Sequence, residues 1–116
     1  MAFLEKAAGQ GHVHAMYVLG ETHFHRKEHE RAVAWFTKSA EAGLPRAMHN
    51  LGCRLEKGEG VAAPDYLEAA GWYRRAADAG NGGAAKNISN MYTLGRGWAW
   101  QMILATSYAT LKPLVS

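Results

Sequence analysis

The chain has 116 residues, a net charge of +3, and a composition that is 48% hydrophobic and 20% charged. This composition is typical of one globular domain and excludes a disordered chain. So mild a charge, with both signs interspersed, does not indicate nucleic acid as a partner. A single cysteine excludes an internal disulfide framework and fits a reducing compartment, so we expect a cytoplasmic or nuclear protein. The first residues lack the apolar core of a signal peptide, so we expect none, and no apolar run approaches the ~20 residues that a membrane span needs.

Three segments repeat one pattern, in which large apolar residues precede small alanines and a closing glycine. The closing glycines are Gly11, Gly43 and Gly80, which lie 32 and 37 residues apart. Four residues after each glycine comes an alanine, and four residues later comes a Leu-Gly or Ile-Ser pair. Such a period predicts stacked helical units. We expect one domain over residues 1–116, built from a half-repeat (1–11), two repeats (12–43 and 44–80) and a divergent terminal repeat (81–116).

The first repeat predicts two helices, over residues 12–26 and 28–42, from apolar residues at helical spacing. Gly20 lies in the interior of the first, where glycine costs about 1 kcal/mol relative to alanine. Its recurrence as Gly52 therefore indicates a place where two helices approach closely. We expect Gly43 to end the second helix in the left-handed conformation.

The second repeat predicts helices over residues 46–57 and 65–80, separated by a glycine-rich break. Val61 follows this break and is expected to fill the turn from the core side. Asp65 and Glu68 have the spacing of a capping box at the start of a helix. The pairs Trp35-Phe36 and Trp72-Tyr73 occupy the same repeat position and are expected in the core. On that basis Trp72→Ala would cost about 3–5 kcal/mol.

The last repeat predicts a helix over residues 83–94, with Asn81 as its N-cap. A further helix is expected over residues 102–111, before Pro113. This segment departs from the repeat, as a terminal unit without a covering neighbour does.

The second repeat also carries a recognisable motif. It reads A-M-H-N-L-G-C-R-L-E-K-G-E-G-V and then D-Y-L-E-A-A-G-W-Y-R-R-A-A-D-A-G. This resembles the Sel-one-like repeat (SLR), an α/α repeat related to the tetratricopeptide repeat, and the likeness extends from residue 3 to about residue 98. Leu55, where the family has a tyrosine, and the short turn after His23 depart from the pattern. Residues 3–8 and 87–97 resemble plant and algal members most.

The resemblance implies an all-α, right-handed superhelix (solenoid) of antiparallel helix pairs, with about three units of which the first and last are incomplete. It implies an adaptor that holds a protein or peptide, in ubiquitin-linked or signalling complexes, without a cofactor and without membrane or nucleic acid as partner. An F-box, which some plant relatives carry, is not visible in this sequence.

In related superhelices the first helix of each pair lines the concave side, so we expect the partner there. Tyr17 and Phe24 are aromatic residues on this side without an evident core role, and aromatics and arginine are usual interface anchors. The alternative is that both only cover the short first turn. Double substitution of Tyr17 and His49 is expected to abolish partner capture with helicity intact. The expected partner-binding residues are His14, Tyr17, Glu21, Phe24, Arg46, His49, Cys53, Glu56, Lys86 and Asn90.

Six histidines leave a metal site as a lesser alternative. His25 and His29, and likewise His49 and Cys53, lie one helical turn apart, and zinc accepts nitrogen and sulfur ligands. Neither pair has a carboxylate at a known metal spacing, so we expect no metal. His49 and Cys53 also resemble a base and a nucleophile, but no third group orients them, and we expect no enzyme.

Self-association is a further alternative. Phe3 and Leu4 would be left uncovered by the missing start of the first repeat, and Trp98 and Trp100 add apolar groups at the other end. Exposed apolar patches mark interfaces. A homo-oligomer formed through the open ends is therefore an alternative to a monomeric adaptor.

Overall fold

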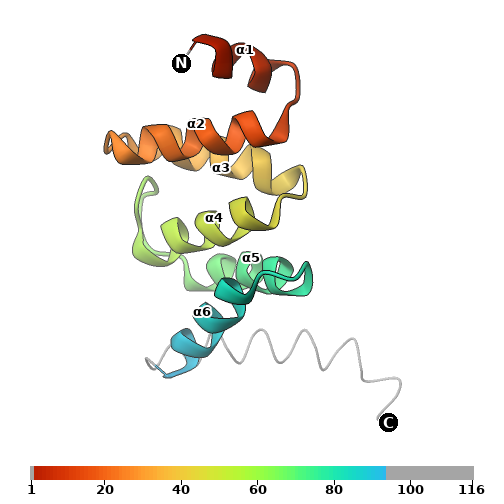
Figure 1. The fold of residues 1–116 in the computed structure, drawn as a ribbon. Coiled ribbons are helices and arrows are strands. Elements are labelled where there is room, and N and C mark those ends of the chain that lie inside the picture. Colours follow the sequence, from red (N-terminus) through yellow and green to blue (C-terminus); the bar gives the residue numbers. More distant parts are fainter. Residues whose placement is uncertain (1, 94–116) are drawn as a thin grey trace.

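The computed structural model describes residues 2–93, which form six α-helices and no strand. The helices are α1 (Ala2–Gly9), α2 (Val13–His25), α3 (His29–Glu41), α4 (Pro45–Lys57), α5 (Tyr66–Asp78) and α6 (Gly82–Thr93). They are stacked in chain order, with α1 and α6 at the two ends (Figure 1). The predicted all-α solenoid is confirmed. The helix expected over residues 102–111, and the tryptophans expected at an open end, lie outside the described residues.

The helix ends follow from local chemistry. The Oδ1 atom of Asp65 accepts a hydrogen bond from the backbone N–H of Glu68 at 3.0 Å, and Asn81 Oδ1 accepts one from that of Ala84 at 2.9 Å. Both side chains therefore satisfy backbone donors that have no partner within their own helix, which confirms both predicted N-caps. Gly43 follows α3 with a φ of 100°, in the left-handed region that glycine adopts without steric cost.

The core lies between the two helices of each pair and between neighbouring pairs. Phe36 of α3 and Tyr73 of α5 are each 1% exposed and are the largest side chains below 2% exposure among the described residues. A Cβ atom built on Gly20 would lie 2.6 Å from Phe36 Cδ1, and one built on Gly52 would lie 2.6 Å from Tyr73 Cε1. The close helix–helix approach predicted at both glycines is therefore confirmed. Val61 is partly buried and packs against the same core, as expected.

The tryptophans differ from the prediction. Trp35 and Trp72 are only partly buried, and a cation covers each ring: Lys38 Nζ lies 4.8 Å from the Trp35 ring and the Arg75 guanidinium 4.4 Å from the Trp72 ring. The expectation that all four aromatics are core residues is therefore wrong for the tryptophans. In each aromatic pair the second residue, Phe36 or Tyr73, is buried in the core. The first residue, Trp35 or Trp72, packs on the outside of the core and stays partly exposed. The expected cost of Trp72→Ala falls accordingly.

Candidate functional site: the first-helix face

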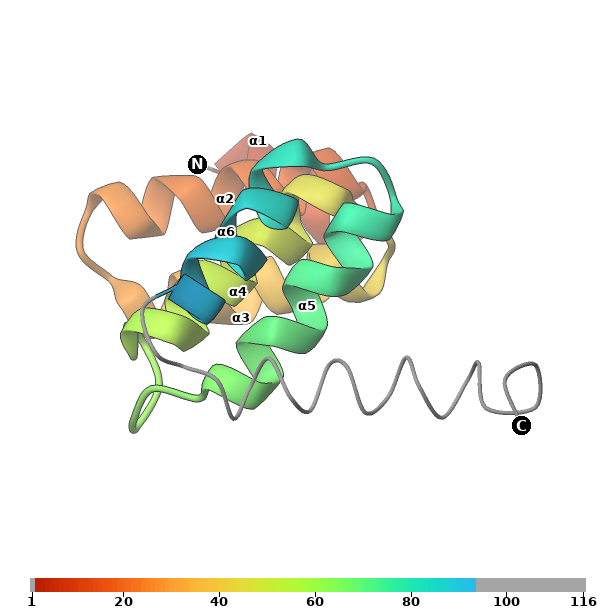
Figure 2. The same ribbon diagram turned by 90° about the horizontal axis from the view of Figure 1, so that it is seen from below.

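The ten predicted binding residues lie on α2, α4 and α6, the first helices of the three units. We call their surface the first-helix face. These helices follow one another in space, as the view along the stack shows (Figure 2), and hydrogen bonds join α2 to α4 and α4 to α6. The structure therefore places these residues on the first helices of successive units, although several of them form hydrogen bonds between repeats.

Tyr17 is part of the core. It is 7% exposed, its ring lies 5.8 Å from that of Phe36, and its hydroxyl accepts a hydrogen bond from Asn50 Nδ2 at 2.9 Å. Burial, followed by the nearby carboxylate of Glu21, raises the pKa of the Tyr17 phenol. The expectation that Tyr17 lacks a core role is therefore wrong, because its ring fills space between α2 and α3 while its hydroxyl ties α2 to α4.

His49 is held in the same manner one repeat later. Asn87 Nδ2 lies 2.9 Å from His49 Nε2 and 3.4 Å from Cys53 Sγ, and the His49 ring lies 6.0 Å from that of Tyr73. In this geometry the amide donates to an unprotonated Nε2. Burial, with a smaller effect from the charge of Arg54, lowers the pKa of His49, which favours the neutral imidazole that such a bond requires.

These two sets of contacts are one device repeated along the solenoid. Asn50 and Asn87 occupy the same position of their repeats, directly before Leu51 and Ile88. Each forms a hydrogen bond with a ring of the preceding repeat: Asn50 with Tyr17, and Asn87 with His49. Both rings also share one repeat position, two residues before Leu19 and Leu51. We call this pair of contacts the asparagine ladder. Our sequence reasoning missed it, although the recurrence of asparagine at one repeat position was a signal that could have revealed it.

Phe24 also packs against other residues of the chain. It is partly buried, and the guanidinium of Arg54 lies 4.1 Å from its ring centroid, within cation–π distance. Arg54 is itself 5% exposed, and its Nε lies 3.0 Å from Glu59 Oε1 in an ion pair whose angle falls outside hydrogen-bond geometry. Arg54 is a second residue that sequence reasoning missed. Its aromatic partner Phe24 lies in α2, 30 residues earlier in the sequence, so no local pattern reveals this contact.

The remaining predicted residues form two groups. Glu21, Cys53 and Glu56 are partly buried, and Glu56 Oε1 accepts a hydrogen bond from the Tyr73 hydroxyl at 2.8 Å. Burial, followed by Cys53 and Glu56, raises the pKa of Tyr73, so its hydroxyl stays a donor. The exposed members of the first-helix face are His14, Arg46, Lys86 and Asn90.

The two pairs considered for metal binding have other contacts. His25 and His29 flank the Phe24 ring, with centroid distances of 5.7 and 5.4 Å. His49 and Cys53 both face the amide of Asn87. Within residues 2–93 no three side chains of histidine, cysteine, aspartate or glutamate gather as a metal site would require. Chemically, the exposed members of the first-helix face offer hydrogen-bonding groups and the positive charges of Arg46 and Lys86, while the partly buried Glu21 and Glu56 add two carboxylates.

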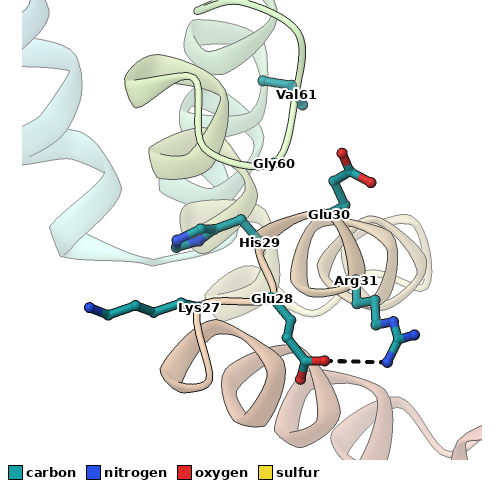
Figure 3. A pocket seen from close by; sticks show the side chains of 7 residues that line it. All are labelled: Lys27, Glu28, His29, Glu30, Arg31, Gly60 and Val61. Carbon is teal, nitrogen blue, oxygen red and sulfur yellow. Dashed lines mark hydrogen bonds and ion pairs between the residues drawn. The ribbon is translucent and has the colours of Figure 1, made fainter.

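A surface depression of about 520 Å³ lies away from this face, between the start of α3 and the loop that contains Gly60 and Val61 (Figure 3). Inside it, Arg31 donates a hydrogen bond to Glu28 at 3.3 Å. The hydrogen bond from His23, at 3.1 Å, is the main cause of the lowered pKa of Glu28. Since charges of both signs line this open depression and Arg31 pairs with Glu28, it shows no preference for an anion or a cation.

Comparison with known proteins identifies the repeat. The family model of the Sel1 repeat matches residues 1–12, 13–44 and 45–81, which is more than half of the chain. No curated protein matches the sequence. None of the helices within residues 2–93 has the length and apolar character needed to cross a membrane.

Two solved structures share the fold. A protective antigen of uropathogenic Escherichia coli strains that displays an SLR fold is 37% identical, with a TM-score of 0.75. A Sel1 repeat protein from Oxalobacter formigenes is 30% identical, with the same TM-score. The matches cover 81% and 82% of this chain but only 21% and 40% of those two chains. With the repeats matched in sequence and the helix pairs matched in space, the chain belongs to the Sel1 repeat family.

Proposed function

We propose that this chain is an adaptor that binds a peptide or protein segment on its first-helix face. Sel1 repeat proteins are in general scaffolds for protein–protein interactions. The observation that carries the proposal is the set of exposed polar residues on the first helices of three successive units, namely His14, Arg46, Lys86 and Asn90. The asparagine ladder supports it, because hydrogen bonds between α2, α4 and α6 hold these helices in a fixed register and so preorganise the face.

Arg46 is the anchor that we propose on this face. Its guanidinium lies 5.9 Å from the Tyr17 ring, so a buried aromatic supports an exposed cation. Arginine is enriched among the residues that contribute most to binding. Lys86 adds a second positive charge two helices away. A segment with carboxylates, or with backbone carbonyls free to accept hydrogen bonds, complements this chemistry.

The structure changes how the proposal is tested. Double substitution of Tyr17 and His49 would break the asparagine ladder, and any loss of binding could then reflect a loss of structure. Arg46→Glu with Lys86→Glu reverses two exposed charges instead. Arg26→Glu with Lys57→Glu is the matched control, since it makes the same change in charge at exposed residues outside the predicted face.

The assay is quantitative affinity capture from a lysate of the source cells, with circular dichroism to verify equal helicity of all three proteins. We expect partners that bind the wild type and the control to be lost with Arg46→Glu/Lys86→Glu. Equal capture by all three would contradict the proposal.

We further propose that the adaptor acts without catalysis, cofactor or metal, in ubiquitin-linked or signalling complexes of the cytoplasm or nucleus. One observation supports the absence of catalysis. The thiol of Cys53 and the ring of His49 both contact the amide of Asn87, and that amide donates to them and does not orient a base. Titration with Zn²⁺ followed by thermal unfolding tests the absence of a metal site, since stabilisation at one equivalent would contradict it.

A further inference from the structure

The exposed side of α5 carries a small hollow beside a glycine. Glu68, Gly71, Trp72 and Arg75 line it, and its volume is about 230 Å³. Leu67, one turn before Gly71 on the same helix, is 42% exposed. The volume lies below the ~300–1,000 Å³ of small-molecule sites, so the hollow suits a single side chain of another protein. This surface lies apart from the first-helix face, and its role does not depend on the function proposed above.

The same side of a second helix stays exposed when a further unit follows it. Glu30 and Ala34 of α3 occupy the repeat positions of Leu67 and Gly71, since each lies 37 residues earlier. Both are exposed, although α4 and α5 follow α3 in the stack. The next unit therefore does not cover this side, and the hollow remains accessible in a solenoid of any length.

Two differences between the repeats produce the hollow. Where α3 has Glu30, α5 has the apolar Leu67, and where α3 has Ala34, α5 has Gly71 without a side chain. The bare backbone at Gly71 leaves a depression beside the partly buried ring of Trp72. The surface of α5 is therefore apolar at a position where that of α3 carries charge.

Glycines inside the helices of this chain receive aromatic rings from neighbouring helices. A Cβ atom on Gly20 would lie 2.6 Å from Phe36 Cδ1, and one on Gly52 would lie 2.6 Å from Tyr73 Cε1. Gly71 also lies inside a helix, where glycine is disfavoured relative to alanine, yet an added Cβ atom would meet no described group within 4 Å. We propose that Gly71 receives, in the same way, an aromatic side chain from an amphipathic helix of a partner protein.

The charges at the two ends of the hollow specify the rest of that helix. Glu68 lies one turn before Gly71 and Arg75 one turn after it. The guanidinium of Arg75 lies 4.4 Å from the ring of Trp72, which holds the positive charge beside the hollow. A partner helix complements both charges when its aromatic residue has a cation one turn away on one side and a carboxylate one turn away on the other.

The experiment titrates a synthetic peptide into the isotope-labelled 116-residue chain and follows backbone amide shifts by NMR. The peptide is an alanine-rich helix that presents lysine, phenylalanine and glutamate one turn apart. We expect saturable shifts that are largest on α5. A second peptide, with alanine in place of the phenylalanine, should bind at least tenfold more weakly.

Gly71→Ala separates binding from folding. Its methyl group occupies the contact and should weaken peptide binding at least tenfold, although the same change should raise the melting temperature. Gly9→Ala is the matched control, since an added Cβ atom there also meets no described group within 4 Å, and binding should stay as in the wild type. Arg75→Glu should weaken binding as well and should prefer a third peptide, in which lysine replaces the glutamate.

Absence of saturable shifts, equal binding to the wild type and to Gly71→Ala, equal binding of the first two peptides, or largest shifts outside α5 would each overturn the proposal. Two other occupants are tested without peptide. A dimer in sedimentation equilibrium that Gly71→Ala disrupts would assign the hollow to a second copy of the chain. Shifts of residues 94–116 on Gly71→Ala would assign it to that segment. Either result would also overturn the proposal.

Discussion

The close contact between Gly52 and the Tyr73 ring leads to a prediction that a matched glycine can check. Gly52→Ala places a Cβ atom 2.6 Å from Tyr73 Cε1, and the ring is 1% exposed and cannot move toward solvent. Overpacking of this kind costs about 1–3 kcal/mol. Alanine also gains about 1 kcal/mol over glycine in a helix interior. Gly71 lies inside α5 where an added Cβ atom would meet no neighbouring group within 4 Å, so Gly71→Ala receives the same gain without the clash.

We therefore expect Gly71→Ala to raise the free energy of unfolding by about 1 kcal/mol. Gly52→Ala should lie about 1–3 kcal/mol below it. Urea unfolding followed by circular dichroism and tryptophan fluorescence measures both, and coincident transitions verify two-state behaviour. The cost of Gly52→Ala should shrink when Tyr73→Leu removes the ring, as a double-mutant cycle would show. If Gly52→Ala stabilises the chain as much as Gly71→Ala, the proposed contact between α4 and α5 is refuted.

Three further predictions use the same unfolding assay. Asn87→Ala removes the donor to His49 Nε2 and leaves that nitrogen without its partner, so it should lower the free energy of unfolding by about 1–3 kcal/mol. An unchanged free energy of unfolding would contradict the asparagine ladder. Folding lowers the pKa of His49 below 6.5, so the unfolded chain binds the proton more readily than the folded chain. The contribution of His49 to the free energy of unfolding is therefore present above pH 6.5 and declines as the pH falls through that value. His49→Gln should flatten this part of the pH profile, whereas parallel profiles would exclude His49 as the cause. Trp72→Ala should cost less than the ~3–5 kcal/mol expected for Tyr73→Ala, since the indole is partly exposed, and a larger cost for the tryptophan would reverse our assignment of the core.

Helix positions and their ends could be predicted from the sequence because short-range physics decides them. The N-caps at Asp65 and Asn81 each need only a side-chain oxygen three residues before a free backbone donor. The left-handed end at Gly43 likewise depends on one residue. Close packing at Gly20 and Gly52 was also predictable, since a glycine repeated within helices, against its own propensity, indicates a neighbour that needs the space.

Which residue of each aromatic pair is buried was not predictable in the same way. Trp35 and Phe36 are adjacent in sequence, and both are apolar enough for the core. Their side chains differ by about 100° around α3, so only the position of the neighbouring helices decides which is covered. Phe36 points to Gly20 and is buried, while Trp35 packs on the cluster of Ala8, Ala15 and Leu19 with Lys38 over its ring.

Helix periodicity assigned Tyr17 and His49 to one face together with Arg46 and Lys86, but it could not say which of these positions the next repeat already uses. In a solenoid, neighbouring first helices lie side by side, so a residue on this face can be directed toward the next helix or away from it. The asparagine ladder shows that the ring position faces the next repeat, because Asn50 and Asn87 bond it in two successive units. A partner must then rely on residues beyond the ladder, and for this reason we place the anchor at Arg46, whose charge is exposed above the ring that the ladder holds.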